Sequence, residues 1–295
     1  MQPPRSRTLF DLLDEIASTA PDVCAVVATE ESLTYGELRA RAASVATRLR
    51  NDGLGRGQRV GVMINNRPQW LEIFFGVSAL GAIVVPFSTW STRSELEFLV
   101  EDSGVEHVFT IDALGDRRFV ADFRAIQQTP AGARLGSIVE VHAGADTFNP
   151  YAVYRNTMAE PLPLTPGVGA SASDTLVLLY TSGSSARPKS VPLQHFATVE
   201  NGFNIGERMG LTAADKVFVP VPLFWSYGAV NALPAIVSHG ATMVIQPRFE
   251  PSEALDIIER EQCTALYTLP AMSNALMSAP GFAASRTRSL RTGLM

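Results

Sequence analysis

Apolar residues in this chain fall into short runs, and segments with helical periodicity separate these runs. RVGVMI at 59–64 predicts a buried strand, and the next segment predicts a helix with Asn66 as its N-cap and Pro68 in its first turn. The β-branched run AIVVPF at 82–87 predicts the next strand. A strand, a helix and a strand in this order form a βαβ unit, in which the two strands are parallel and the crossover is right-handed.

The helix of this unit is apolar enough to resemble a membrane span at first sight. WLEIFFGVSALGAIVVPF at 70–87 approaches the ~20 apolar residues that cross a bilayer. It contains Glu72, however, and Gly81 breaks it before the β-branched run. The sequence therefore favours a helix, apolar on nearly all sides, that packs within a large core and leads into a buried strand.

A second βαβ unit is predicted later in the chain. Its strands are KVFVPV at 216–221 and ATMVIQ at 241–246, and SYGAVNALPAIVSHG between them contains the helix. The other expected helices lie at 92–102, 116–128, 251–262 and 270–279, and the other expected strands at 105–110, 137–141, 264–269 and 290–295. We therefore predict an α/β fold of two related subdomains, each a mostly parallel sheet flanked by helices.

We divide the chain near residue 170. Residues 1–170 are expected to form the first α/β subdomain together with a connection at 142–173 that is rich in Pro, Gly and Ala, and residues 171–295 the second. The sequence stops within the predicted strand at 290–295, so we expect the second subdomain to be truncated there. An incomplete sheet leaves apolar surface and an unpaired strand edge, and both favour self-association.

Composition narrows the classes of protein. Hydrophobic residues make up 46% and charged residues 18% of the 295 residues, which indicates a soluble protein with a large core. The net charge of −5 and the lack of a basic run argue against nucleic-acid binding. Cys24 and Cys263 form no CxxC motif, which indicates a reduced, cytoplasmic setting without structural zinc. The first fifteen residues lack the apolar stretch of a secretory signal.

One short polar stretch points to phosphate chemistry. YTSGSSARPKS follows the apolar run TLVLL, so a buried strand leads into a loop of small hydroxyl residues with a lysine at its far end. Backbone N–H groups, hydroxyls and an ammonium group are donors that bind phosphate. The candidate phosphate-binding residues are Thr181, Ser182, Gly183, Ser184, Ser185 and Lys189. A solvated Ser/Gly loop between two strands accounts for the composition alone equally well.

Two other motifs fail on these residues. A P-loop requires a second Gly where Pro188 stands, and it must lead into a helix, whereas VPLQH after Ser190 predicts a strand. A Ser-x-x-Lys nucleophile requires Ser where Ala186 stands. The stretch therefore belongs to neither class of site.

A third pattern fits the whole stretch. YTSGSSARPKSVPLQH resembles the phosphate-loop signature of the adenylate-forming (AMP-binding) superfamily, which includes the acyl-CoA synthetases. LTYGEL at 33–38, the unit at 59–87, VPLFWSYG at 221–228 and TALYTLPA at 264–271 are similar to family segments that occur in the same order. The resemblance thus extends over nearly the whole chain.

The resemblance implies a reaction and its participants. A fatty or aryl carboxylate would attack the α-phosphate of ATP with Mg²⁺, and CoA, as co-substrate, would then take the acyl group. The loop that ends at Lys189 would contact the β- and γ-phosphates, and Trp225, Tyr227 and Gly228 would line the acyl pocket. Because Trp225 stands where amino-acid-activating relatives have an Asp, an uncharged acyl or aryl chain is favoured.

Other residues of the resembling segments are expected to be structural. Tyr180 is expected in the core of its strand, and His195 is expected to cap the helix that follows it and not to transfer protons. Ala186 and Ser190 depart from the family pattern, which has Gly at both positions. An Ala at a position that needs positive φ would strain the loop.

The chain lacks several motifs of the family. The adenine and Mg²⁺ motif (Y-G-x-T-E), the ribose-binding Asp and the main catalytic Lys are expected beyond residue 295, so no catalytic residue and no metal ligand is assigned within the chain. We interpret the chain as the N-terminal part of an enzyme that is inactive by itself. Two alternatives stay open: transfer of the acyl group to a carrier protein, and a short form that binds nucleotide or acyl groups without catalysis.

Overall fold

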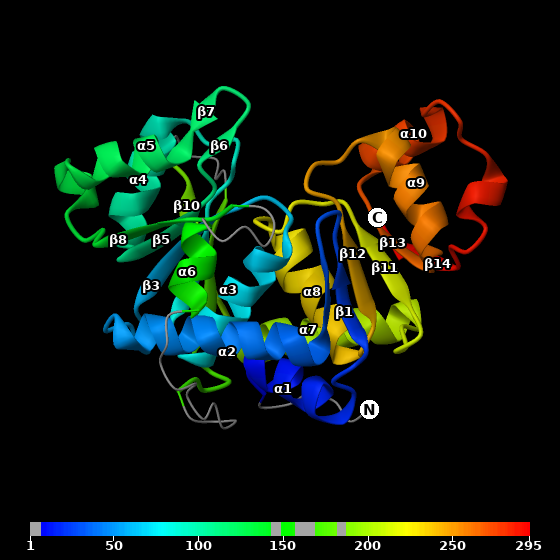
Figure 1. Ribbon diagram of the computed structural model, residues 1–295, viewed down its shortest axis with the longest axis horizontal. Helices are drawn as coiled ribbons and strands as arrows, with labels where there is room; N and C mark the ends of the chain where they lie inside the picture. Colours follow the sequence, from blue (N-terminus) through cyan, green and yellow to red (C-terminus); the bar gives the residue numbers. More distant parts are fainter. Residues whose placement is uncertain (1–6, 143–148, 157–168, 182–186) are drawn as a thin grey trace.

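Two six-stranded sheets organise the chain (Figure 1). The structure is a computed structural model that describes residues 7–142, 149–156, 169–181 and 187–295. The first sheet has the order β10 (Lys189–Gln194), β9 (Thr175–Thr181), β4 (Ile83–Pro86), β3 (Arg59–Met63), β5 (His107–Thr110), β8 (Ser137–Glu140). The second has the order β14 (Thr292–Leu294), β13 (Ala265–Tyr267), β11 (Lys216–Val219), β12 (Thr242–Ile245), β1 (Cys24–Val27), β2 (Ser32–Thr34).

The two sheets have the same design. Within the described residues, neighbouring strands are parallel except for one edge pair in each sheet, β9–β10 in the first and β1–β2 in the second. Parallel strands need crossover connections, and most of these connections are helices. The predicted α/β fold of two mostly parallel sheets flanked by helices is therefore confirmed.

Helices form a layer between the sheets and cover the outer face of each sheet (Figure 1). The layer between the sheets contains α1 (Leu9–Thr19), α2 (Tyr35–Asn51), α3 (Pro68–Ala79), α7 (His195–Met209) and α8 (Leu233–Ser238). The outer helices are α4 (Arg93–Ser103) and α5 (Phe119–Gln127) on the first sheet, and α9 (Pro251–Glu261) and α10 (Pro270–Ser278) on the second. The main hydrophobic core extends over both sheets and the helices between them, and a smaller cluster lies under α9.

Helix α3 is the apolar segment that resembled a membrane span. All of its residues are buried, as expected for a helix with an apolar surface all round. Glu72 on this helix is fully buried, and its carboxylate lies 3.0 Å from Arg41, 2.8 Å from Arg155 and 2.7 Å from the hydroxyl of Tyr151. Two cations and a hydroxyl satisfy this buried charge. No helix in the described part of the chain is long and apolar enough to cross a bilayer.

Each sheet takes strands from both sides of residue 170. Strand β1 is paired with β12, with Val26 opposite Met243, although β1 and β12 lie near opposite ends. Strand β9, which leads into the candidate phosphate loop, is paired with β4 through Val177 and Val84. The proposed division near residue 170 therefore divides the sequence but does not divide the sheets, because each sheet contains strands from before and after this residue.

Several local features differ from the sequence prediction. Residues 113–118 form a small hairpin of β6 (Ala113–Leu114) and β7 (Arg117–Arg118), so α5 begins at Phe119 and not at 116. The expected connection contains α6 (Pro150–Asn156), and short 3₁₀ turns occur at Pro130–Gly132 and Ala284–Thr287. A π-helix, Tyr227–Ala232, precedes α8, in which Pro234 lies at the first turn and lacks the N–H of a regular helical bond. Asn66 does not cap α3: Arg67 holds the N-cap position without a side-chain bond.

Candidate functional site

The hairpin of β9 and β10 presents the described ends of the candidate phosphate loop. Thr181 is the last residue of β9 and is paired with Lys189, the first residue of β10. Both are exposed, so the lysine ammonium and the threonine hydroxyl are available to a ligand at the open end of the hairpin. Ser182, Gly183, Ser184 and Ser185, together with Ala186, lie outside the described residues. The prediction that VPLQH forms a strand, and not the helix of a P-loop, is confirmed by β10.

Asn66 joins the end of β3 to the segment that the sequence assigned to the acyl pocket. Its amide Nδ2 donates to the carbonyl of Val221 at 2.9 Å, and its Oδ1 accepts from the N–H of Leu223 at 2.8 Å. The side chain is only 4% exposed, so both bonds are shielded from water. These bonds fix the segment 221–228 of the second sheet against the carboxyl end of the first. Local sequence could not reveal this role, because both partners are more than 150 residues away.

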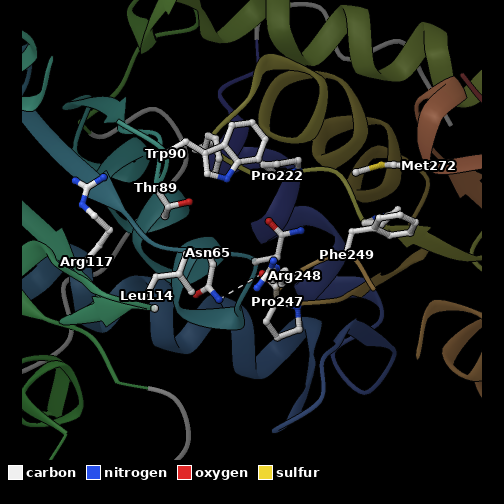
Figure 2. A pocket seen from close by; sticks show the side chains of 14 residues that line it. Asn65, Thr89, Trp90, Leu114, Arg117, Pro222, Pro247, Arg248, Phe249 and Met272 are labelled. Carbon is white, nitrogen blue, oxygen red and sulfur yellow. Dashed lines mark hydrogen bonds between the residues drawn. The ribbon is translucent and has the colours of Figure 1, made fainter. Parts of the chain in front are cut away.

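A cavity of about 720 Å³ lies between the two sheets (Figure 2). All of its lining residues come from segments that follow the carboxyl ends of parallel strands, which is where open α/β sheets bind ligands. They are Asn65, Asn66, Thr89, Trp90, Leu114, Gly115, Arg117, Pro220, Pro222, Phe224, Pro247, Arg248, Phe249 and Met272. Most of the described lining residues are apolar, and the charged ones among them are Arg117 and Arg248. Asn65 bonds the carbonyl of Pro247 at 3.3 Å, which ties the two sheets together a second time (Figure 2).

A second cavity, of about 500 Å³, lies beside the β9–β10 hairpin. Its lining includes Tyr180 and Thr181 from β9, Val191 from β10, and Trp225 and Tyr227 from the segment after β11. The sequence predicted a phosphate loop and an acyl pocket in two separate stretches of the chain. The structure brings the described parts of both stretches to the same cavity.

Trp225 belongs to an aromatic cluster that the sequence analysis did not predict. Its ring contacts Trp90 edge-on, with 5.0 Å between ring centroids, and Phe224 with 6.1 Å. Trp90 follows β4 and is 63% exposed, so it lies at the surface over the half-buried Trp225. Its partners Phe224 and Trp225 lie far along the chain, so no local sequence signal identified it.

Gly228 permits a close approach of two backbone segments. A Cβ atom at this position would lie 2.5 Å from the carbonyl oxygen of Pro222 and 2.9 Å from the Cα of Leu223. These distances are too short for any side chain, because the atoms in the way are backbone atoms. The residue therefore shapes the turn that positions Trp225 and Tyr227, and no side chain at 228 reaches a ligand.

The residues expected to be structural have defined partners. Tyr180 lies in β9, but it is half-buried and lines the smaller cavity, so the expectation of a core residue is not met; its hydroxyl donates to Asp102 at 2.6 Å. His195 does not cap α7, and the N-terminus of this helix has no side-chain cap. Nδ1 of His195 instead accepts a hydrogen bond from the backbone N–H of Leu9, at the start of α1, at 3.1 Å. The prediction that it caps the following helix is therefore wrong, because the ring turns away from α7 toward α1.

Both cysteines are free thiols, and neither is activated. Burial is the main cause that raises the pKa of Cys24 above its ordinary value, and it raises the pKa of Cys263 to about 12. A thiol with a raised pKa is a poor nucleophile at neutral pH. The cysteines therefore offer no catalytic group to the cavities.

Comparison with known proteins identifies the family. The family model described as AMP-binding enzyme matches residues 13–295. The chain belongs to the AMP-binding enzyme family. It is 30% identical to the acyl-CoA ligase sidI of Aspergillus fumigatus, covering 89% of this chain and 46% of that protein. It is also 30% identical to a feruloyl-CoA synthase of Amycolatopsis sp, covering 94% of this chain and 51% of that protein.

Two solved structures have the same fold as this chain. The N-terminal domain of FACL13 from Mycobacterium tuberculosis superimposes with a TM-score of 0.84 at 24% identity, covering 97% of this chain and 68% of that chain. The anthranilate CoA ligase AuaEII superimposes with a TM-score of 0.85 at 23% identity, covering 99% of this chain and 56% of that chain. The chain thus spans about half the length of the curated relatives that it matches.

Proposed function

We propose that the chain is the N-terminal part of an acid–CoA ligase that uses ATP and Mg²⁺ to convert a carboxylic acid into an acyl-adenylate and then into acyl-CoA. The observation that supports this most directly is the cavity shared by the phosphate-loop hairpin and the segment at 221–228. A carboxylate in this cavity would lie beside the groups that bind the phosphates of ATP. Membership of the AMP-binding enzyme family supports the same conclusion.

The residues of the hairpin would act by position and charge. Pyrophosphate leaves when the carboxylate attacks the α-phosphate, so negative charge develops on the leaving group. An ammonium group and hydroxyls already in place stabilise that charge without rearrangement. In this proposal Lys189 and Thr181 hold the β- and γ-phosphates together with Ser182, Gly183, Ser184 and Ser185. ATP would supply the adenylyl group that is transferred, and Mg²⁺ would supply charge that screens its phosphates.

The acyl group would lie against Trp225 and Tyr227, over the turn that Gly228 permits. Among the described residues that line the smaller cavity, the one charged side chain is that of Glu95. A cavity without a cation favours the uncharged acyl or aryl chain of the acid. The similarity to the feruloyl-CoA synthase of Amycolatopsis sp supports an aryl acid as substrate, and the similarity to the acyl-CoA ligase sidI supports an acyl chain.

The test uses the full-length product of the gene that encodes this chain. Exchange of labelled pyrophosphate into ATP, which measures adenylation, should depend on an added fatty or aryl acid, and addition of CoA should give the thioester. A reaction without acid is the control. Exchange that is absent with every acid, or independent of acid, would contradict the proposal. Adenylation without CoA thioester, but with transfer to a carrier protein, would support the carrier alternative.

A further inference from the structure

Helix α4 places a row of side chains beside the hairpin of β9 and β10. Glu95 and Leu99 line the smaller cavity together with residues of the hairpin. Phe98 and Asp102 contact residues on either side of the candidate phosphate loop. These four positions are three or four residues apart, so they share one face of the helix. The helix is therefore part of the wall of the candidate site, and not only a cover of the first sheet.

The first contact is a hydrogen bond at the end of β9. The hydroxyl of Tyr180 donates to the carboxylate of Asp102 at 2.6 Å, a distance typical of an O–H donor on an ionised acceptor. Burial, and after it this bond, raises the pKa of Tyr180 above its ordinary value, so the phenol keeps its proton and donates at neutral pH. Because Tyr180 directly precedes Thr181, the bond holds the strand where the candidate phosphate loop begins.

The second contact is at the other end of the loop. The guanidinium carbon of Arg187 lies over the ring of Phe98, 5.7 Å from its centre, within the range of a cation–π interaction. Pro188, whose ring restricts the backbone, is the one residue between Arg187 and Lys189. The contact therefore holds the chain directly before the lysine. Residues 182–186, between the two contacts, lie outside the described part of the chain.

Both contacts come from one well-defined helix. A capping box of Thr92 and Glu95 fixes the start of α4, and Gly104 in the left-handed conformation ends it. Phe98 and Asp102 lie one turn apart, about 6 Å along the helix axis. Groups that stabilise a leaving pyrophosphate act by being in place before the reaction, and a displacement of ~1 Å can slow a reaction about 10²-fold. A helix that holds both ends of the loop would supply this placement.

We propose that α4 positions the candidate phosphate loop for adenylation. Asp102 is a positioning residue that acts through Tyr180 on the start of the loop. Phe98 is a positioning residue that acts through Arg187 on its end. This inference rests on the proposed function, because it concerns how the same site holds the phosphates of ATP. The sequence analysis assigned neither Asp102 nor Phe98 to the site.

The first experiment measures pyrophosphate exchange by variants of the full-length gene product. Tyr180→Phe and Asp102→Ala each remove the same hydrogen bond, so kcat should fall about tenfold in both, whereas the KM for the acid should stay nearly fixed. Asp102→Asn keeps an oxygen acceptor and should restore most of the rate. Glu101→Ala removes the exposed carboxylate next to Asp102 and is the matched control, with the rate of wild type.

A double variant distinguishes positioning from direct contact with the substrate, because Tyr180 also lines the smaller cavity. If Asp102 acts through Tyr180, Tyr180→Phe/Asp102→Ala should be about as slow as either single variant. Losses that multiply in the double variant would show that the two residues act separately and would overturn the inference.

The contact at the other end of the loop has its own pair of variants. Phe98→Leu removes the ring below Arg187 and should slow exchange about two- to fivefold. Phe98→Tyr keeps the ring and should keep the rate. Equal rates for Phe98→Leu and wild type would overturn the role of Phe98.

Unfolding in urea separates positioning from a merely structural role. The residues of both contacts are partly exposed, so the midpoint should stay close to that of wild type in every variant. Losses of rate that follow losses of stability, with no rescue by Asp102→Asn, would overturn the inference. Wild-type rates in Tyr180→Phe and Asp102→Ala would also overturn it and leave the ligase function standing. Absence of acid-dependent exchange in the wild type would overturn the proposed function itself.

Discussion

The backbone N–H of Leu9 donates a hydrogen bond to Nδ1 of His195 across 3.1 Å, so a side chain from α7 caps the first turn of α1. His195 has no exposed surface. Because Nδ1 accepts this bond, the neutral ring carries its proton on Nε2, which has no partner among the described residues. Burial lowers the pKa of His195 from 6.5 to about 4.

The lowered pKa of His195 predicts acid sensitivity. The unfolded chain binds a proton below about pH 6.5 and the folded chain only below about pH 4, so the stabilisation by the neutral ring is complete above pH 6.5 and is lost as the pH falls toward 4. His195→Asn, which keeps an acceptor but does not titrate, should reduce the loss of stability between pH 7 and pH 4 by about 3 kcal/mol. Urea unfolding at several pH values measures this, and the exposed His142→Asn is the control. Parallel pH profiles of wild type and His195→Asn would contradict the prediction.

Asn66 should be important for stability although it caps no helix. Asn66→Ala removes two buried hydrogen bonds and leaves the Leu223 N–H and the Val221 carbonyl without partners, so we expect a loss of about 2–4 kcal/mol in the free energy of unfolding. Asn201→Ala removes an exposed hydrogen bond from its side-chain amide to the side chain of Asn231. This substitution should cost less than about 0.5 kcal/mol. Denaturant titration distinguishes the two. Equal effects would show that the bridge between the sheets contributes no more than a surface contact.

Lys189 should affect adenylation and not folding. The side chain is exposed, and one charged contact to phosphate contributes about 1.5–3 kcal/mol, so Lys189→Ala should slow pyrophosphate exchange by the full-length product ~10–100-fold. Ser190→Ala is the matched control, because adjacent residues of a strand point to opposite faces. A rate that does not change in Lys189→Ala would place the lysine outside the phosphate site.

Trp225 should control the size of the acid. Trp225→Ala opens space beside Tyr227 and removes a ring that packs on Trp90, so the ratio of kcat/KM for bulkier acids to smaller ones should rise by about tenfold or more. The KM for ATP should stay nearly fixed. Val153→Ala on α6 changes an exposed apolar residue elsewhere and should alter neither value. A change in the ATP dependence without a change in acid preference would remove Trp225 from the acyl pocket.

The sequence predicted those elements whose signal is local. The βαβ unit at 59–87 was correct because its helix and strands differ sharply in length and in β-branched content. The hairpin at 113–118 was missed because its strands are only two residues long, and helix α5 was therefore extended backwards to Asp116. The π-helix at Tyr227–Ala232 has the same apolar pattern as an α-helix, and Pro234 was the one sign of it.

The candidate site was predicted as residues but not as an arrangement. Lys189 was assigned from the loop around it and Trp225 from the resemblance to the family; Trp225 lines the smaller cavity, and Lys189 is paired with Thr181, which lines it too. Asn66 and Trp90 were missed because their contacts are with segments far along the chain, and no local pattern encodes such a contact.

The pairing of β1 with β12 sets the order in which the second sheet can be completed during synthesis. Val26, which is fully buried, lies opposite Met243, and at roughly 5–20 residues per second the ribosome needs about 10–40 s to make the chain between them. Throughout that interval β1 has at most β2 as a partner, because the parallel neighbour β12 has not yet been made. The first strand made therefore gains its parallel neighbour only after β12 has been synthesised, and one edge of this apolar strand stays open until then.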